Sequence, residues 1–384
     1  MKFIHTSDLH LGLRLCEMRM NEDIAHLLRE IADIAVRENC SAVVIAGDIY
    51  DRSNPTPESV ALFDSFVTDL AARGVSVLSV YGNHDSPERV AYLSRLLSEN
   101  GVHFSPLYDG TLYETSFDDA YGTVRFHLLP FLRPSVLRLT CPDFTGTTAA
   151  DTVRFALKGI SLSDGDRHVC IAHQFAAGAK EPSDEAVGGT ELVPYTLFEA
   201  FDYTALGHLH SPHAVGKEHI RYSGSPLKCS FSEAADEKSV TLVELKEKGN
   251  ISFRPVPLHP LRDLREMHGS YEDMTSFSMR SSGNTEDYLR IVLTDDEDIP
   301  DVMAKLRTVY PNLLRLSYDN KRTREMRQID TDRLTDPDDG ALSPAAVFAE
   351  LYELQHNEEA DDALMKEVMR LFDECTKEDS HATA

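Results

Sequence analysis

The sequence predicts an α/β protein in which two packed β-sheets are flanked by helices, and three observations support this fold class. Residues 2–80 alternate apolar strands with amphipathic helices, which is typical of parallel strands joined by right-handed crossovers. From about residue 102 the helical pattern thins and short strand-like runs take over. With 384 residues, of which 42% are hydrophobic, the chain can bury a sizeable core.

The first elements follow the order β-α-β-α-β. Each apolar run is short enough for a strand, whereas the segments between them place apolar residues at helical spacing. We predict strands over 2–7, 42–46 and 75–80, a helix over 20–38 and a second helix with Pro57 in its first turn. Further strands are predicted over 124–130, 168–173, 203–208, 219–225, 239–245 and 251–258. Together these elements predict one large domain over residues 1–258.

A second unit is predicted over residues 259–335. It contains apolar strands over 288–293 and 313–318 with a helix over 299–310 between them, which predicts a small β-α-β unit. Residues 334–342 are polar and rich in turn signals, so they predict a linker. The chain would thus carry a third, separate segment over residues 336–384.

Two short amphipathic helices are predicted in this last segment. Ser343 is a suitable N-cap and Pro344 a suitable first helical residue. Each helix has one apolar and one acidic face, and each is too short to be stable alone in water. An amphipathic helix pair on a tether more often docks on a partner than forms a core, although folding back onto its own chain is the alternative.

The charge and composition exclude some classes of protein. A formal net charge of −26 argues against a large basic surface for nucleic acid, but residues 328–384 carry 16 acids and 4 bases, so much of this charge lies in the tail. Bound divalent ions would also reverse the field locally. The sequence has no signal-peptide pattern, no run of 18 apolar residues and no C-x-x-C pair among its six cysteines. We therefore expect a cytoplasmic chain with reduced thiols.

Side chains that can bind metals recur where predicted strands end. In α/β sheets the ligand crevice lies at the carboxyl ends of the strands, so distant segments can meet there. The residues are Asp8 and His10 in "SDLH", Asp48 in "AGDIYD", Asn83 and His84 in "GNHD", His173 in "IAHQ", and His208 and His210 in "GHLH". Each motif alone is a weak signal, since "GNHD" is also a good turn and "GHLH" could be two surface histidines. Five such motifs in succession indicate a metal centre.

The residue types narrow the choice of metal and of chemistry. Carboxylates, imidazoles and an amide oxygen without a thiolate suit Mn²⁺, Fe²⁺ or Zn²⁺ better than Ca²⁺ or a structural zinc. Two such ions bridged by one carboxylate would clamp a phosphate and activate water. Asp48 follows the middle one of the three parallel strands and is the natural bridge.

The succession D-x-H, G-D-x-x-D, G-N-H-D, a single histidine and G-H-x-H resembles the calcineurin-like metallophosphoesterases. Longer segments resemble, more narrowly, the SbcD family, which supplies the nuclease subunit of bacterial SbcCD DNA-repair complexes. These segments are "MKFIHTSDLHLG", "VYGNHDSPERV", "YTALGHLHSPHAVG", "IRYSGSPLKCSFSE" and "LSPAAVFAELYE". The resemblance implies a four-layer sandwich of two mixed β-sheets flanked by helices. It also implies a small α+β capping domain over 259–335 and partner-binding helices in 336–384.

The resemblance also implies roles for the motif residues. One metal would be held by Asp8, His10, Asp48 and His210, and the other by Asp48, Asn83, His173 and His208. His84 would face the scissile phosphate as a catalytic residue. Asp51 would also be catalytic if its carboxylate accepts a hydrogen bond from His84, although archaeal and eukaryotic relatives carry histidine there and Asp51 could instead be a turn residue. Arg52 could contact a phosphate or solvent, and Asp85 is expected to be structural.

The implied activity is a Mn²⁺-dependent DNA nuclease with two metal ions. It would be a 3′→5′ double-strand exonuclease and a single-strand and hairpin endonuclease, acting with an SbcC-type ATPase in DNA repair, recombination and replication. The two subunits would form a heterodimer or heterotetramer, and the nuclease domain a homodimer. Residues 87–100 offer a stripe for that dimer through Val90, Leu93, Leu96 and Leu97, unless this face packs on its own sheet. A phosphatase or phosphodiesterase for small substrates, and a scaffold without metal, are the alternatives.

Overall fold

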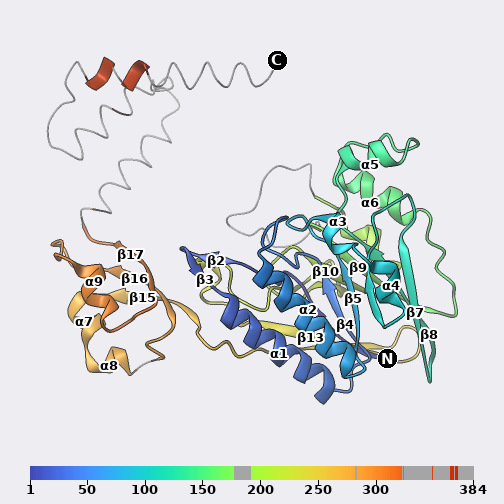
Figure 1. Ribbon diagram of the computed structural model, residues 1–384, viewed down its shortest axis with the longest axis horizontal. Helices are drawn as coiled ribbons and strands as arrows, with labels where there is room; N and C mark the ends of the chain where they lie inside the picture. Colours follow the sequence, from blue (N-terminus) through green and yellow to red (C-terminus); the bar gives the residue numbers. More distant parts are fainter. Residues whose placement is uncertain are drawn as a thin grey trace. The chain divides into compact units, whose positions relative to one another are not determined.

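The computed structural model describes residues 1–176, 192–281 and 283–321, together with 323, 348, 364–366 and 368–370. The contacts between its residues divide the chain into two units, Met1–Tyr318 and Asp319–Ala384. All labelled helices and strands belong to the first unit (Figure 1). Among the described residues, no helix is both long and apolar enough to span a membrane.

The first sheet confirms the predicted β-α-β-α-β start of the chain. Within the described residues its six strands are ordered β14-β13-β1-β4-β5-β6. Their bounds are β1 Lys2–Thr6, β4 Ala42–Ala46, β5 Ser76–Val80, β6 Val102–Phe104, β13 Ser239–Leu245 and β14 Ile251–Pro257. Strands β1, β4, β5 and β6 run parallel, whereas β13 and β14 add antiparallel pairs at one edge.

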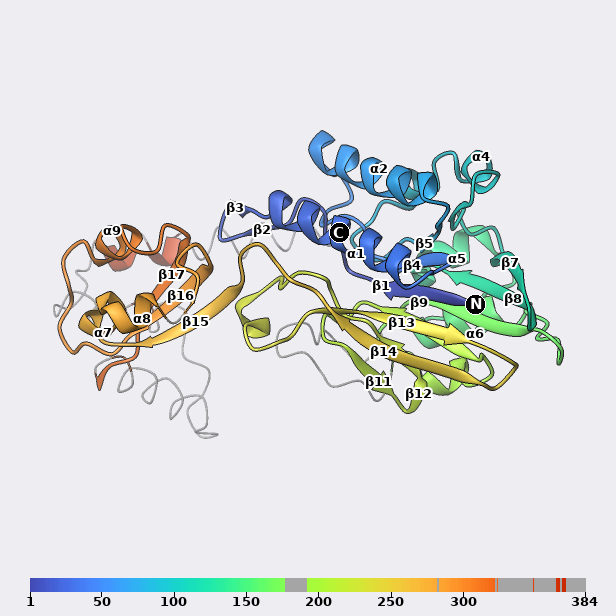
Figure 2. The ribbon, with the colours of Figure 1, turned by 90° about the horizontal axis from the view of Figure 1, so that it is seen from below.

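Two long helices cover one face of this sheet. Helix α1 spans Asn21–Arg37 and α2 spans Pro57–Ala72. Helix α2 begins as the sequence predicts, because the Thr56 hydroxyl accepts a hydrogen bond from the backbone N–H of Ser59 and Pro57 occupies the first turn. Side chains such as Ile24, Leu27 and Phe63 pack against Val43 and Ile45 of the sheet, and Figure 2 shows both helices on this side.

The second sheet has the order β11-β12-β10-β9-β8-β7. Its strands are β7 Tyr113–Asp119, β8 Gly122–Leu129, β9 Arg167–His173, β10 Tyr203–Gly207, β11 His213–Val215 and β12 Lys217–Tyr222. The four central strands run parallel. Helices α5 (Pro134–Thr140) and α6 (Ala149–Leu157) lie between β8 and β9 in the sequence.

Separate apolar cores hold these layers together. The two sheets enclose one core that includes Phe3, Val44, Leu78, Phe126 and Ile171, all fully buried. A further core on the outer side of the second sheet joins that sheet to α6. The fold thus has four layers, in which two packed sheets have helices on their outer faces. The predicted sandwich of two mixed sheets is confirmed.

A small three-stranded sheet follows the sandwich. Strands β15 (Leu264–Gly269), β16 (Tyr288–Leu293) and β17 (Leu313–Tyr318) are all parallel. Helices α7 (Tyr271–Thr275), α8 (Phe277–Arg280) and α9 (Val302–Arg307) accompany it, and the sheet has a core of its own. The predicted β-α-β unit is therefore present, but its helix is shorter than 299–310 because Asp301 has a left-handed backbone (φ 55°). The domain boundaries near residues 258 and 335 stay predictions.

The segment 87–100 is not one continuous helix. It contains α3 (Pro87–Val90) and α4 (Ser94–Ser98), which are separated where Leu93 takes a left-handed backbone conformation with φ 58°. The predicted apolar stripe is therefore split. Val90 is buried and Leu97 packs on the core beneath α2, whereas Leu93 and Leu96 are 49% and 57% exposed.

The predicted tail helices fall mostly outside the described residues. Only residue 348 of the first helix is described, and it is helical. In the second, residues 364–366 and 368–370 are helical, in agreement with the prediction for that part. Two further short strands, β2 (Arg14–Leu15) and β3 (Met18–Arg19), form a hairpin before α1.

Candidate metal centre

Five strand ends bring the predicted ligands together. Asp8 and His10 follow β1, Asp48 follows β4, and Asn83 follows β5 in the first sheet. In the second sheet His173 is the last residue of β9, and His208 and His210 follow β10. Because β1, β4 and β5 are parallel neighbours, as are β9 and β10, their carboxyl ends face one crevice, as the sequence predicts.

The backbone at this crevice is strained. Among the described residues, nine non-glycine residues have positive φ, and four of these are predicted ligands: Asp8 (53°), His10 (43°), Asp48 (48°) and His208 (109°). Such conformations cost about 1–3 kcal/mol each and cluster at functional sites. Gly82 is required for a different reason, since a Cβ there would collide with the Asp48 carboxylate. The loops therefore approach one another more closely than ordinary side chains allow.

Asp8, His10 and His210 form the first ligand cluster. One ligand atom from each lies within 4.8 Å of the others. The Nε2 atoms of His10 and His210 are 3.2 Å apart, and His10 Nε2 lies 3.9 Å from Asp48 Oδ2. Two nitrogens that bind one ion at about 2.1 Å are separated by about 3.0–3.4 Å, so the spacing fits a shared metal.

The second cluster approaches the same oxygen of Asp48. His173 Nε2 is 3.3 Å from Asp48 Oδ2 and 2.9 Å from Asn83 Oδ1, and His208 Nδ1 is 3.1 Å from the same Asn83 oxygen. Asp8, Asp48 and His173 also place one ligand atom each within 4.8 Å of the others. Asp48 Oδ2 is thus close to a histidine of each cluster, as a bridging carboxylate would be.

Hydrogen bonds behind the rings orient the imidazoles. His173 Nδ1 lies 2.8 Å from the carbonyl oxygen of Ala46, so Nδ1–H donates there and Nε2 is left for a ligand. His210 Nδ1 lies 3.1 Å from Glu233 Oε1. Among the described residues, the buried Nδ1 atom of His10 has no hydrogen-bond partner. This nitrogen faces Asp51, whereas His10 Nε2 faces the first cluster. The imidazoles oriented in this way around carboxylates fit divalent metal ions.

The protonation of the metal-free cluster differs from one candidate ligand to the next. Burial alone would raise the pKa of Asp48, but the imidazoles of His173 and His10 hold it below its usual range. Burial lowers the pKa of His208 to about 4, and it lowers the pKa of His10 as well. Burial would also lower the pKa of His173, but the Asp48 carboxylate outweighs it and raises that pKa to about 9. Burial would lower the pKa of His210 too, but hydrogen bonds to Cys229 and Glu233 raise it to about 12. Asp48 is therefore ionised and His10 and His208 are neutral, as metal ligands require, whereas His173 and His210 must each release a proton when a metal ion binds.

His84 lies beside the ligands with an exposed side chain. Its backbone N–H donates to Asp48 Oδ1 at 2.9 Å, and its ring packs edge-on against His10 with 5.0 Å between centroids. Its Nδ1 lies 2.9 Å from the backbone carbonyl of Asp51. The hydrogen bond that the Asp51 carboxylate could have accepted is thus made to the carbonyl instead. Among the described residues, His84 Nε2 makes no hydrogen bond.

The Asp51 carboxylate has other neighbours. Its Oδ2 is 3.4 Å from Arg52 Nε, and its Oδ1 is 4.0 Å from His10 Nδ1. The Arg52 side chain is 79% exposed, so solvent is its main environment. A ring nitrogen of His84 also lies within 4.8 Å of an Asp51 carboxylate oxygen and of a His10 ring nitrogen. The catalytic role of Asp51 remains a prediction.

Two acidic residues support the centre from behind. Asp85 is buried and accepts backbone hydrogen bonds from Ile49, Tyr50 and Gly82, in line with the structural role expected of it. Glu233 was not predicted as a site residue. The signal for it is its place at the end of "IRYSGSPLKCSFSE", a segment that entered the prediction only through its resemblance to relatives.

Comparisons with known proteins agree with this geometry. Residues 1–212 match the family model for calcineurin-like phosphoesterases, and residues 259–356 match the model described as the type 5 capsule protein repressor C-terminal domain. A Staphylococcus epidermidis protein that is named as the SbcD component of the nuclease SbcCD is 33% identical over 325 residues, which cover 83% of this chain and 85% of that protein. A protein of Staphylococcus saprophyticus with the same name is 30% identical over 323 residues, covering 83% and 84%.

A solved dimetal phosphatase from Danio rerio is a more distant likeness. It shares 15% identity with a TM-score of 0.39, and the match covers 66% of this chain and 95% of that one. These values are too low to support an assignment. The assignment rests instead on the family models and on the two staphylococcal nuclease components. The chain belongs to the calcineurin-like phosphoesterases and, within them, to the SbcD family of phosphodiester-hydrolysing nuclease subunits.

Proposed function

We propose that this chain is the Mn²⁺-dependent nuclease subunit of an SbcCD-type complex and cleaves DNA with two divalent metal ions. The observation that carries the proposal is the pair of ligand clusters that meet at Asp48, with the exposed His84 imidazole next to them. Family membership supports divalent metals in general. The carboxylate, imidazole and amide donors suit Mn²⁺, Fe²⁺ or Zn²⁺, and the choice of Mn²⁺ among them rests on the resemblance to the SbcD family.

The chain's own residues divide the work of hydrolysis. Asp8, His10, Asp48 and His210 would hold one ion, and Asp48, Asn83, His173 and His208 the other. The chemistry that bound ions supply is Lewis acidity toward the phosphate and a lowered pKa of water. His84 faces the substrate with a free Nε2, from which it donates a proton to the leaving oxygen or stabilises negative charge. The Asp51 carbonyl keeps that ring in place.

The proposal includes substrate and partners. The activity would be 3′→5′ exonucleolytic on double strands and endonucleolytic on single strands and hairpins, in DNA repair, recombination and replication in the cytoplasm. Both staphylococcal relatives are named as components of SbcCD, which supports an SbcC-type ATPase as partner, in a heterodimer or heterotetramer. Residues 336–384, mostly outside the described residues, are the proposed docking segment.

A homodimer of the nuclease domain is also part of the proposal. The exposed side chains of Tyr92 (70%), Leu93 (49%) and Leu96 (57%) offer apolar surface at the break between α3 and α4. Val90 and Leu97 pack against the apolar core, so the exposed surface differs from the stripe that the sequence predicted.

Cleavage of a hairpin oligonucleotide with Mn²⁺, with and without the ATPase partner, tests the function. We expect His84→Gln to keep both ions, measured by elemental analysis, and to lose about 10²–10⁴-fold in rate, because only general-acid or charge-stabilising function is removed. His268→Gln, at an exposed histidine of β15, is the matched control and should cleave like the wild type. Loss of metal in His84→Gln would contradict its role. Hydrolysis of small phosphate esters without DNA cleavage would favour the phosphatase alternative.

A further inference from the structure

A buried ion pair lies directly behind His210. Glu233 and Lys238 are each 7% exposed, and Lys238 Nζ lies 2.5 Å from Glu233 Oε2. The other carboxylate oxygen, Oε1, lies 3.1 Å from His210 Nδ1. The backbone N–H of Cys229 donates to Oε2 at 3.2 Å. Both oxygens of Glu233 are therefore engaged, one by the imidazole and one by the ion pair.

This arrangement fixes which nitrogen of His210 is free. Since a carboxylate only accepts hydrogen bonds, His210 Nδ1 carries the proton that it donates to Glu233. Nε2 is then the nitrogen that can bind a metal ion once its own proton is released. That Nε2 is the atom 3.2 Å from His10 Nε2 in the first ligand cluster. Lys238 also holds the main chain, because it donates to the His210 carbonyl at 3.0 Å and to Ser225 Oγ at 3.1 Å. One ion pair thus fixes both the ring and the backbone of His210.

The desolvation cost of the buried Glu233–Lys238 pair indicates a role other than stabilising the fold. Burying two charges takes several kcal/mol of desolvation from each, and such pairs often add little to stability compared with apolar residues of the same volume. Carboxylates that hydrogen-bond a metal-binding histidine, by contrast, raise its basicity and fix its orientation. From the geometry we propose that Glu233, with Lys238 as its counter-ion, is a positioning residue that presents His210 Nε2 to a divalent metal ion. This inference rests on the proposed function, in which His210 is a ligand.

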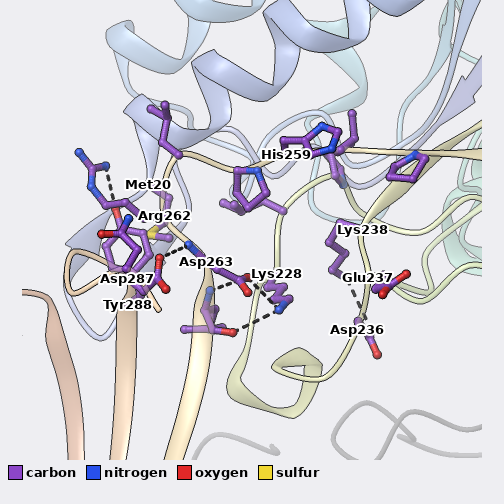
Figure 3. A pocket seen from close by; sticks show the side chains of 18 residues that line it. Met20, Lys228, Asp236, Glu237, Lys238, His259, Arg262, Asp263, Asp287 and Tyr288 are labelled. Carbon is purple, nitrogen blue, oxygen red and sulfur yellow. Dashed lines mark hydrogen bonds and ion pairs between the residues drawn. The ribbon is translucent and has the colours of Figure 1, made fainter. Parts of the chain in front are cut away.

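The segment that contains Glu233 and Lys238 is also held in place by a second lysine, Lys228. Between β12 and β13 it contains only the single turn η2 (Phe231–Glu233) within the described structure. Lys228 Nζ donates to the Ala234 carbonyl at 2.8 Å and to the Leu264 carbonyl at 3.2 Å, and it pairs with Asp263 at 2.8 Å. Figure 3 shows Lys228, Asp263 and Lys238 on the wall of one cavity of about 630 Å³. The position of Glu233 thus depends on contacts with β15 as well as with His210.

Titration of the metal-free protein with Mn²⁺ by calorimetry tests the proposal. In the wild type we expect two ions per chain. Glu233→Gln should lower the affinity for one ion by about 10–100-fold, the usual effect of losing such a carboxylate, and leave the other ion unchanged. Glu237→Gln is the matched control, because this exposed glutamate lines the same cavity and should leave both affinities unchanged. Wild-type affinity for both ions in Glu233→Gln would overturn the proposal.

A second variant separates positioning from folding. Glu233→Gln leaves Lys238 buried without its carboxylate, which destabilises the segment whatever the role of Glu233. The double variant Glu233→Gln/Lys238→Met removes that charge and should recover part of the stability that Glu233→Gln loses. It should not reach the urea midpoint of the wild type, because Lys238 also donates to the His210 carbonyl and to Ser225 Oγ, and the Mn²⁺ affinity should stay low. If the double variant recovers both stability to urea and wild-type Mn²⁺ affinity, Glu233 is merely structural. The absorption spectrum of the Co²⁺-substituted protein is an independent readout, since altered coordination by His210 should change its visible bands.

His210→Ala separates this inference from the proposed function. If His210→Ala loses one ion and Glu233→Gln loses none, the positioning role alone fails. If His210→Ala itself binds both ions with wild-type affinity, His210 is not a ligand and the inference falls together with that assignment.

Discussion

Replacing Asp85 tests whether one buried carboxylate joins two loops of the metal centre. Asp85 is 5% exposed and follows the Asn83-His84 pair after β5. Its Oδ1 accepts from the Tyr50 N–H at 2.9 Å, and its Oδ2 accepts from the N–H groups of Ile49 at 3.1 Å and Gly82 at 2.9 Å. The first two donors belong to the loop after β4, which carries Asp48.

The magnitude follows from the number of donors left without an acceptor. Asp85→Ala removes the acceptor of three backbone N–H groups, each of which costs about 1–3 kcal/mol when it stays buried and unpaired. We expect a loss of at least about 3 kcal/mol, and less than the full sum where water enters the space. Asp85→Asn has the same shape and can keep one oxygen toward Ile49 and Gly82. Its amide group then faces the Tyr50 N–H, so we expect a loss of about 1–3 kcal/mol.

Urea unfolding of the metal-free protein, followed by circular dichroism, measures these differences. The order of stability should be wild type, Asp85→Asn, Asp85→Ala, and Mn²⁺ affinity should fall in the same order because the loops carry Asp48 and Asn83. Asp64→Asn, on the exposed side of α2, is the control and should unfold like the wild type. The reasoning is refuted if Asp85→Ala unfolds within about 0.5 kcal/mol of the wild type and binds Mn²⁺ equally well.

Asp48→Asn should weaken the binding of both metal ions and Asp8→Asn mainly the binding of one, as measured by Mn²⁺ calorimetry. If Asp48→Asn still binds two ions with wild-type affinity, Asp48 does not bridge them. Light scattering should show that the chain forms a dimer as its concentration rises, and Leu96→Glu should weaken this association. A monomer throughout the micromolar range would contradict the proposed homodimer. Deleting residues 336–384 should abolish binding to SbcC and ATP-stimulated cleavage but spare activity on short single strands, and co-purification of the truncated chain with SbcC would contradict this. Burial lowers the pKa of His5 to about 3, so below pH 6.5 the unfolded chain binds an extra proton and the free energy of unfolding falls by up to about 1.4 kcal/mol per pH unit. His5→Gln should reduce this acid sensitivity in urea titrations between pH 7 and 4, and an unchanged slope would show that His5 is not the cause.

The sheets and the convergence of the candidate ligands were predictable because they depend on short-range patterns. Apolar runs such as 42–46 identify buried strands, and parallel strands necessarily bring their carboxyl ends to one edge. A motif that follows each strand therefore indicates a shared site before any distance is known. The convergence of Asp8, Asp48 and His173 follows from this rule.

Other features depend on packing that no local pattern reveals. Strand β15 has only Leu264 and Met267 buried among polar residues, so it lacks the apolar run by which β16 was found. The left-handed conformation of Leu93 is unusual for such a residue, and the sequence 87–100 remains helical in periodicity across the break. Glu233 reaches His210 from a segment with little regular structure, where side-chain direction cannot be inferred from spacing.

The same contacts that form the metal centre limit what a loss of activity can prove. Asp8 accepts hydrogen bonds from the backbone N–H of His208, and Asp48 accepts one from that of His84, so each carboxylate also fixes a loop of another motif. Several of these residues have positive φ, and hydrogen bonds of this kind must offset the strain. Replacing any one of them is then expected to disturb its neighbours, and the effects of two replacements should not add. Metal stoichiometry, rather than cleavage, is therefore the measurement that can separate ligands from residues that hold ligands in place.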